Sequence, residues 1–418
     1  PSVAFISAFL NNTPVVVIFA PIIKHWAKSV KLPATKFLIP LSYVTILGGI
    51  CTLIGTSTNL VVHGMILEAG YEGFTMFELG KVGIFIAIAG IIYLFIFSKR
   101  LLPDARPDTA VPDEEVEEGE KLHRVEAVLG ARFPGINKKL SDFNFQRHYG
   151  AEVKEIKTRN GQRYVDHLED VVLREGDTLV VMADDTFIPT WGESSVFVLL
   201  TNGNDPDTSG KKKRWLALIL LVLMIVGATV GELPATKEMF PDIKLDMFFF
   251  VCITTIIMAW TNIFPARKYT KYISWDILIT IACAFAISKA MVNSGVADCV
   301  AGFIIGLSDD YGPHVLLAIL FVITNLFTEL ITNNAAAALA FPLALSISAQ
   351  LGVSPTPFFV VICMAASASF STPIGYQTNL IVQGIGNYKF TDFVRIGLPL
   401  NIITFLISVI LIPLIWNF

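Results

Sequence analysis

The chain has 418 residues, of which 54% are hydrophobic and 16% are charged, and its formal net charge at pH 7 is −4. Soluble domains carry about 25% charged residues and fewer apolar ones, so this composition excludes an ordinary soluble enzyme. The charges are concentrated in one segment, and their distribution does not suggest nucleic acid as a partner. The sequence therefore predicts an integral membrane protein that is not an enzyme.

The chain opens at Pro1 inside an apolar run, and we expect membrane helices to precede it. Asn11, Asn12 and Thr13 interrupt this run, and Pro14 follows them. Polar residues ahead of a proline, with apolar sequence on both sides, favour a helical hairpin whose tip stays inside the protein. The new helix begins with unpaired N–H groups that attract an anion, while Asn and Thr supply neutral oxygens for Na⁺. We call these three residues the first tip.

A polar break interrupts the next apolar stretch, residues 37–67. Non-helical backbone at this depth survives only where it is buried or lines a cavity. Its free carbonyl groups can bind a cation, while adjacent helix N-termini face an anion. A plain kink in the helix is the alternative interpretation. The break, which we call the first loop, consists of Gly55, Thr56, Ser57, Thr58 and Asn59.

Other apolar stretches are uninterrupted and predict helices that cross the bilayer. They are residues 82–97, 215–230, 247–264 and 393–416. Such stretches must be helical because lipid offers the backbone no hydrogen-bond partner.

The composition changes at residues 101–214, which we call the insert. An acidic run at residues 113–118 and a basic run at residues 211–214 are typical of linkers. Short alternating stretches such as residues 178–182 lie between them. We therefore expect a soluble domain between two membrane portions, residues 1–100 and 215–418.

Basic residues favour the cytoplasmic side when they lie in short loops beside membrane spans. Here they cluster at residues 24–36, 99–100, 211–214 and 267–271. If all four clusters are cytoplasmic, the insert is cytoplasmic too. We expect a multi-pass protein of the lipid bilayer, in the inner membrane of a bacterium.

The second membrane portion contains the same two kinds of polar break. A second tip is predicted at Thr332, Asn333 and Asn334, before alanines that allow close helix approach. A second loop is predicted at residues 371–379. Its candidate binding residues are Thr372, Gly375, Gln377, Thr378 and Asn379.

These breaks belong to an internal repeat. Residues 55–64 resemble residues 375–384, and each segment is followed by Phe-Thr-x-Phe. Each tip ends eight positions before a proline, Pro21 or Pro342. A basic loop follows the first tip, whereas the loop after the second tip has no basic residue, so the two halves should enter the membrane from opposite sides. Inverted halves with discontinuous helices are typical of secondary transporters whose site lies near the midplane.

Two interpretations of the tips remain open. Single Asn or Thr residues in membrane helices often only cap a helix or link it to a neighbour. Two related tips, each paired with its own loop, favour a shared binding site instead. On that interpretation Na⁺ is held at the tips by Asn12, Thr13, Asn333 and Asn334.

Glu329 lies three residues before the second tip, in apolar sequence where an ionised carboxylate is costly unless it is paired. It could bind a coupling cation or proton, pair with Lys289, or hydrogen-bond across helices. The five cysteines have no CxxC or Cys/His spacing, and no nucleotide or metal motif stands in a credible context. The sequence thus predicts no cofactor, disulfide or catalytic residue.

At the tips and loops the chain resembles the divalent anion/sodium symporter family of the ion transporter superfamily. The family's tips carry Ser-Asn-Thr, which Asn12, Thr13 and Asn333 match, while Asn11 replaces the serine. Its loops are of Thr-Pro-Pro type, and residues 57–58 and 376–378 depart from the prolines. The resemblance implies two hairpins that re-enter the membrane, two broken helices, Na⁺ at both tips and a homodimer.

Within the insert, residues 125–188 resemble an RCK C-terminal (TrkA-C) domain, most clearly at residues 173–181. This resemblance implies a small α+β domain that senses an unknown small ligand. A structural spacer is the alternative. Members of the family that carry such an insert include several thought to move sulfate.

The sequence as a whole predicts an all-α transporter with an inverted repeat, which carries out Na⁺-coupled symport of a small divalent anion by alternating access. Sulfate is the leading candidate, and a dicarboxylate fits less well because of residues 376–378. One alternative is a Na⁺/H⁺ antiporter or arsenite-type permease of the same superfamily, with Glu329 as the proton carrier. Another is a ligand-gated, channel-like protein regulated by the insert.

Overall fold

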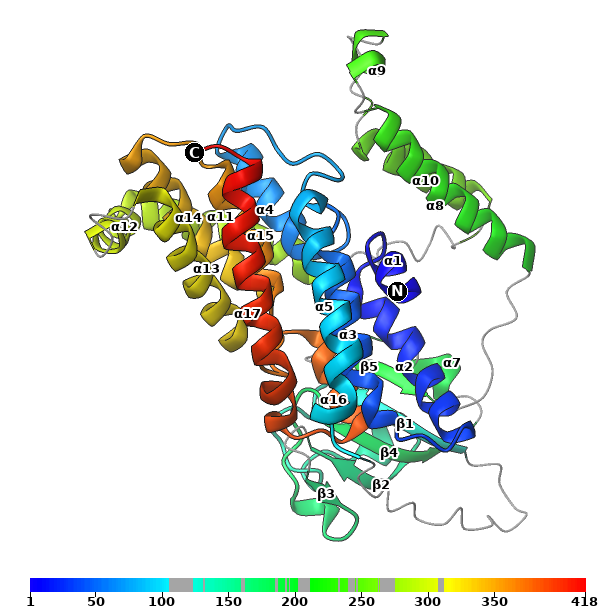
Figure 1. The fold of residues 1–418 in the computed structure, drawn as a ribbon. Coiled ribbons are helices and arrows are strands. Elements are labelled where there is room, and N and C mark those ends of the chain that lie inside the picture. Colours follow the sequence, from blue (N-terminus) through cyan, green and yellow to red (C-terminus); the bar gives the residue numbers. More distant parts are fainter. Residues whose placement is uncertain are drawn as a thin grey trace.

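The chain is described by a computed structural model. The described residues are 1–104, 123–130, 132–158, 162–184, 187–191, 194, 196–201, 211–231, 234–239, 245, 247–261, 263, 275–306 and 312–418. The acidic run at residues 113–118 and the basic cluster at residues 267–271 lie outside this set. Helices form most of the described part, and one small sheet forms the rest (Figure 1).

The first membrane portion folds into a hairpin of two helices, a broken helix and one long helix. The helices are α1 Ser2–Ser7, α2 Asn12–Ser29, α3 Leu38–Gly49, α4 Ser57–Glu68 and α5 Gly80–Leu101, with a 3-10 turn at Ala34–Lys36. Asn11 of the first tip lies between α1 and α2, and Asn12 and Thr13 begin α2. Pro14 stands in the first turn of α2, where its lack of an N–H costs no hydrogen bond. Gly55 and Thr56 of the first loop lie in the gap between α3 and α4, whereas Ser57, Thr58 and Asn59 form the first turn of α4, so the predicted non-helical backbone ends at Thr56.

The second membrane portion ends with the same order of elements. Its helices are α8 Lys211–Gly231, α9 Pro234–Met239, α10 Met247–Trp260, α11 Trp275–Asn293, α12 Val296–Gly306, α13 Gly312–Leu330, α14 Asn333–Leu351, α15 Thr356–Ser367, α16 Gln377–Gly386 and α17 Phe390–Ile415. The second tip joins α13 to α14, and the second loop joins α15 to α16. The stretches predicted as uninterrupted spans are helical in α5, α8, α10 and α17. One feature was not predicted: α11 and α12 meet at a 71° bend, where Gly295 has a φ of +72°.

Several helices present apolar faces that only a membrane would cover. Among the described residues, α5, α13, α14 and α17 are long and apolar enough to cross a bilayer. Phe95 of α5 is 87% exposed and Leu414 of α17 is 74% exposed. Such contiguous apolar surface is not tolerated in water. The protein is an integral membrane protein.

Hydrogen bonds define the two ends of the helical part. At one end, Lys36 donates to the Leu102 carbonyl at 2.5 Å, so the start of α3 lies beside the end of α5. At the other end, Trp416 donates to Glu78 at 3.2 Å, so the end of α17 lies beside the start of α5. The ring of Phe418 lies 5.5 Å from that of Phe358, which places the start of α15 at this second end.

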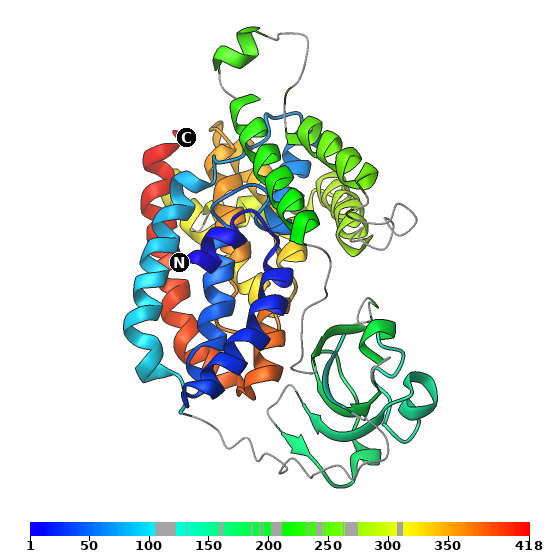
Figure 2. The ribbon, with the colours of Figure 1, turned by 90° about the vertical axis from the view of Figure 1, so that its right-hand side faces the viewer.

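The two tip helices run in opposite directions along this axis. Helix α2 runs from the first tip to the end where α3 starts, and α14 runs from the second tip to the end where α15 starts (Figure 1). The first end is also the end that carries the insert, as Figure 2 shows.

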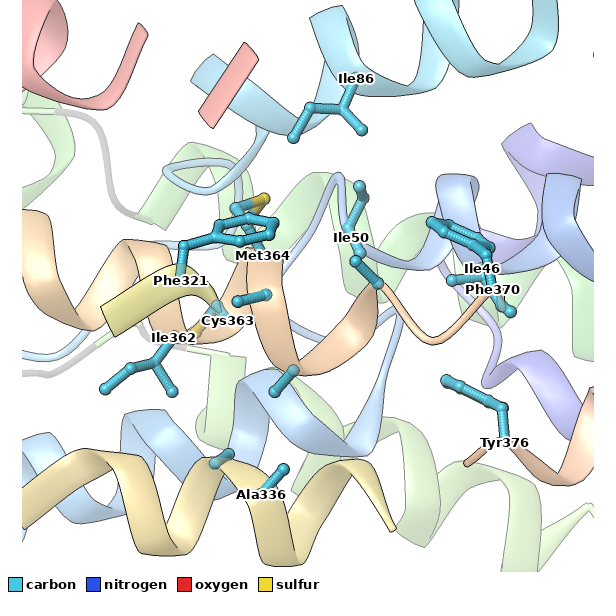
Figure 3. Packing of buried hydrophobic residues seen from close by; sticks show 14 of the residues in the cluster. Ile46, Ile50, Ile86, Phe321, Ala336, Ile362, Cys363, Met364, Phe370 and Tyr376 are labelled. Atoms are coloured by element: carbon cyan, nitrogen blue, oxygen red, sulfur yellow. The ribbon is translucent and has the colours of Figure 1, made fainter. Parts of the chain in front are cut away.

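The core of the helical part is centred on α15. Residues 357–367 are all buried, and they pack against α13, α14 and α17. Figure 3 shows part of this core, with Ile46 of α3, Phe321 of α13 and Met364 of α15. The tips and loops are therefore held by a packed scaffold and not by mobile surface segments.

The insert has its own core around a five-stranded antiparallel sheet of order β3-β2-β4-β1-β5. Its elements are β1 His123–Leu129, α6 Phe145–Tyr149, β2 Glu152–Lys157, β3 Arg163–Tyr164, β4 Thr178–Ala183, α7 Phe187–Trp191 and β5 Phe197–Thr201. Aromatic rings of Phe133, Phe145, Tyr149 and Phe197 fill that core. The sheet continues past residue 188, where the predicted core ended, because β5 pairs with β1. The sheet is compatible with a separate α+β insert.

The insert docks on the helical part through an ion pair and a close packing contact. Lys24 of α2 lies 3.0 Å from Glu126 of β1, and Lys157 lies 3.4 Å from the same carboxylate. Burial alone would raise the pKa of Glu126, but these two ammonium groups lower it to about 2. Nearby, Gly384 of α16 faces Thr178 at the start of β4, and a Cβ at Gly384 would lie only 2.5 Å from the Thr178 Oγ1.

Candidate functional site

Each tip is braced by a hydroxyl from the helix before it. Ser7 Oγ donates to Asn12 Oδ1 at 2.6 Å, and Thr328 Oγ1 donates to Asn333 Oδ1 at 2.8 Å. Both bonds join residues five positions apart. The two buried asparagines are thus fixed in the same way in both halves.

The two loops are also held by matching bonds. Asn59 Nδ2 donates to the Thr52 carbonyl at 2.9 Å, and Asn379 Nδ2 donates to the Thr372 carbonyl at 3.1 Å, in each case across seven positions. These buried amides close each loop on itself, because unwound backbone at this depth needs partners.

The tips contact the loops of the opposite half. Thr13 Oγ1 of the first tip lies 3.3 Å from Gln377 Oε1 of the second loop. Asn334 Oδ1 of the second tip accepts from Ser57 at 3.3 Å and from Thr58 at 3.2 Å, both in the first loop. Residues far apart in sequence therefore enclose one common space.

Tyr376 strengthens the crossing at the first tip. Its hydroxyl accepts from Asn12 Nδ2 at 2.5 Å and lies 3.1 Å from Thr56 Oγ1. One side chain of the second loop thus joins the first tip to the first loop. The sequence analysis placed Tyr376 in the second loop, but it counted only its neighbours Gly375 and Gln377 among the binding residues, although Tyr376 occupies the repeat position of Thr56.

A cavity of about 570 Å³ lies at this crossing. Nine predicted residues line it: Asn11, Thr13, Ser57, Thr58, Thr332, Asn333, Asn334, Gly375 and Gln377. The lining adds residues outside the predicted binding set, including Tyr376, Thr280 and Glu175 of the insert.

The other predicted residues lie behind the cavity wall. Gly55 and Thr56 are beside the first tip, while Thr372 donates to the Glu329 carbonyl at 2.9 Å. Ser42 Oγ of α3 donates to Asn379 Oδ1 at 2.7 Å and lies 2.9 Å from Thr378 Oγ1. The structure places this group, with Asn12, Asn59 and Glu329, next to the cavity wall but outside the set that lines the cavity.

The first loop offers a group of neutral oxygens suited to a small hard cation. A Cβ on Gly49 would lie 2.5 Å from Asn12 Oδ1 and 3.0 Å from the Gly55 carbonyl. A Cβ on Gly55 would lie 2.5 Å from the Gly49 carbonyl and 2.9 Å from the Ala8 carbonyl. Asn59 Oδ1 is buried close by and accepts no hydrogen bond from any described residue. Carbonyl and amide oxygens of unwound backbone are the ligands expected for Na⁺.

Glu329 hydrogen-bonds across helices, as one of the three predicted alternatives had it. Its Oε1 accepts from the Ser371 N–H at 2.8 Å and from Asn401 Nδ2 of α17 at 2.7 Å. Lys289 is exposed and, within the described residues, forms no ion pair with it, so the alternative of a Glu329–Lys289 pair is wrong. The second oxygen, Oε2, is buried and has no partner among the described residues.

Known proteins resemble this chain over most of its length. The sequence model of the family described as citrate transporter (CitMHS) matches residues 2–346 and 239–418. An uncharacterized transporter of Synechocystis, sll0640, is 30% identical over 98% of this chain and 81% of its own.

Two further relatives match in part. Sodium/sulfate cotransporter 2 of Chlamydomonas reinhardtii is 30% identical over 67% of this chain and 31% of its own. The sodium-dependent dicarboxylate transporter SdcS of Staphylococcus saprophyticus is 25% identical over 35% of this chain and 28% of its own. Because the family match covers nearly all of its residues, the chain belongs to the citrate transporter family, CitMHS, of the ion transporter superfamily.

Proposed function

We propose that the protein is a secondary transporter that couples the inward movement of Na⁺ to that of a small divalent anion, with sulfate as the leading candidate. The observation that carries this proposal is the crossing of tips and loops around one cavity, with Thr13 on Gln377 and Asn334 on Ser57. The relatives named as sodium/sulfate cotransporters support the choice of ions.

Binding of Na⁺ and binding of the anion are coupled because the tips and loops around the cavity carry no positive charge. The tips and loops offer amides, hydroxyls and carbonyls, which cannot by themselves offset two negative charges. Na⁺ bound at Asn12 and the first loop, and at Asn333 and the second loop, would neutralise the anion and order its site. Each ion then raises the affinity for the other by the same factor.

Alternating access follows from the inverted arrangement that we propose for the two halves. Helices α2 and α14 run in opposite directions from their tips. If each half adopts the conformation of the other half, the cavity opens to the opposite side of the membrane. We also propose that the protein is a homodimer in a bacterial inner membrane with its insert in the cytoplasm.

The choice of sulfate over a dicarboxylate rests on the second loop. Tyr376 and Gln377 stand where the family resemblance has prolines, and both side chains line the cavity. They add a hydroxyl and an amide to the lining, and we propose that these polar groups suit a compact tetrahedral anion. The dicarboxylate transporter SdcS matches only 35% of this chain.

Each of the two alternative functions is supported by one observation. The unpartnered Oε2 of Glu329 favours an antiporter or permease in which this carboxyl carries a proton. A hollow of about 350 Å³ in the insert, lined by Tyr164, His167 and Arg174 among others, favours a ligand-sensing domain that regulates flux. The second feature is compatible with symport as well, and we propose that the insert binds a small ligand there.

Removal of Na⁺ tests the proposed symport. Purified protein in liposomes should take up labelled sulfate when Na⁺ is outside, and replacement of Na⁺ by K⁺ or choline should abolish the uptake. Protein-free liposomes are the control. Uptake that ignores Na⁺ and follows a pH gradient would instead establish the proton-linked alternative.

Gly49→Ala tests the cation site in the first loop. The added methyl group would occupy the space next to Asn12 Oδ1 and the Gly55 carbonyl, and we expect Na⁺ affinity to fall by about tenfold or more, or about 1.4 kcal/mol. Gly64→Ala is the matched control, since its nearest neighbour would lie 3.9 Å away. Both variants are checked for a monodisperse profile and for thermal unfolding. A well-folded Gly49→Ala protein with unchanged Na⁺ dependence would remove this site from the mechanism.

Glu329→Gln separates symport from proton-linked transport. The amide oxygen of glutamine can still accept from Ser371 and Asn401, and a neutral acceptor in place of a charged one costs about 1 kcal/mol. We therefore expect Na⁺-dependent sulfate uptake to fall by about fivefold or less. Complete loss of transport by a folded variant would show that the carboxyl itself is required.

A further inference from the structure

The insert contributes a side chain to the transport cavity. Glu175 lies in the turn that precedes β4, and it lines the cavity together with both tips and the second loop. It is half-buried, and no described residue hydrogen-bonds or ion-pairs with its side chain. Among the described residues that line the cavity, it is the only charged one.

Hydrogen bonds hold the turn that carries Glu175, and they fix the position of its carboxylate at the cavity. Asp177 is fully buried and accepts from the Arg174 N–H at 2.7 Å, which closes the turn. The Gly176 N–H donates to the Leu129 carbonyl of β1 at 2.9 Å, which ties the turn to the sheet. Gly176 has a φ of +83°, a conformation that favours glycine.

The same turn packs on α16, whose N-terminus begins in the second loop. A Cβ on Gly176 would lie 3.4 Å from Leu380 Cδ2, and Leu380 itself lines the cavity. The ion pair between Lys24 and Glu126 holds the sheet against α2 on the other side. The docked insert therefore places Glu175 in the lining of the cavity, together with residues of both tips.

We propose that Glu175 is a residue of the anion pathway that disfavours occupation of the cavity by a divalent anion, so that the docked insert lowers the anion affinity of the transport site. This inference rests on the proposed function, since it needs an anionic substrate. A carboxylate has the same sign as the anion, and no basic side chain among the described lining residues offsets it. The insert would then act as an electrostatic plug that is effective only while it is docked.

Equilibrium binding of labelled sulfate to the purified full chain at saturating Na⁺ tests this proposal. A unit charge that opposes a divalent anion at about 10 Å in a wet cavity changes affinity by roughly three- to tenfold, so Glu175→Gln should lower the Kd for sulfate by that factor. Glu169→Gln, an exposed carboxylate elsewhere on the insert, is the matched control and should bind like the unmodified protein. The gain at Glu175→Gln should shrink at high ionic strength.

Two binding results would overturn the proposal. One is a Kd for sulfate that is the same in Glu175→Gln and the unmodified protein. The other is a variant in which only the Na⁺ dependence weakens, because the carboxylate would then serve the cation.

A second measurement does not depend on transport or on the identity of the anion. Glu175→Cys and Gln377→Cys are combined in a chain whose native cysteines are replaced, and a flexible bis-maleimide is added to membranes. Cross-linking is expected for this pair and not for Glu169→Cys with Gln377→Cys. Absence of the cross-link would refute the placement of Glu175, whereas a chain that cross-links but binds no sulfate would refute the proposed substrate alone.

Discussion

Contacts between each hairpin tip and the loop of the opposite half are the constraint on which the rest of the site depends. Thr13 reaches Gln377, and Asn334 reaches Ser57 and Thr58. Neither half encloses the cavity by itself, because residues of both halves line it. The packed core around α15 matters for function because it sets the distance between the two halves and so determines whether these contacts form.

Unwound backbone in the middle of a membrane protein needs internal partners, and this chain supplies them with small residues and amides. Asn59 donates to the Thr52 carbonyl just before the first loop, and Asn379 donates to the Thr372 carbonyl near the start of the second loop. Gly49 and Gly55 allow the first loop to approach the first tip so closely that side chains would collide. The same features that satisfy the backbone leave neutral oxygens around a small space, which is why the structural and ion-binding roles fall on the same residues.

The sequence alone could predict the features that depend on local residue patterns. The polar breaks, the long apolar helices and the positions of Asn12 and Asn333 all follow from residue type and from the repeat. It could not identify contacts between halves, so the role of Tyr376 in joining Asn12 to Thr56 was not predicted, although residues 376–378 were expected to bear on the substrate. Glu175 was missed because nothing in the insert's own sequence tells where the insert docks. The bend at Gly295 was missed although Asn293 and Ser294, which precede it, are typical of turns.

The central claim is that both tips and both loops surround one anion whose binding requires Na⁺. Crystals grown in Na⁺ with selenate, a heavier tetrahedral analogue of sulfate, test it most directly through anomalous scattering at the selenium edge. The account predicts one selenium peak per chain, between Thr13, Gln377, Ser57 and Asn334, which disappears when K⁺ replaces Na⁺. A peak outside this crossing, or one that persists without Na⁺, would contradict it.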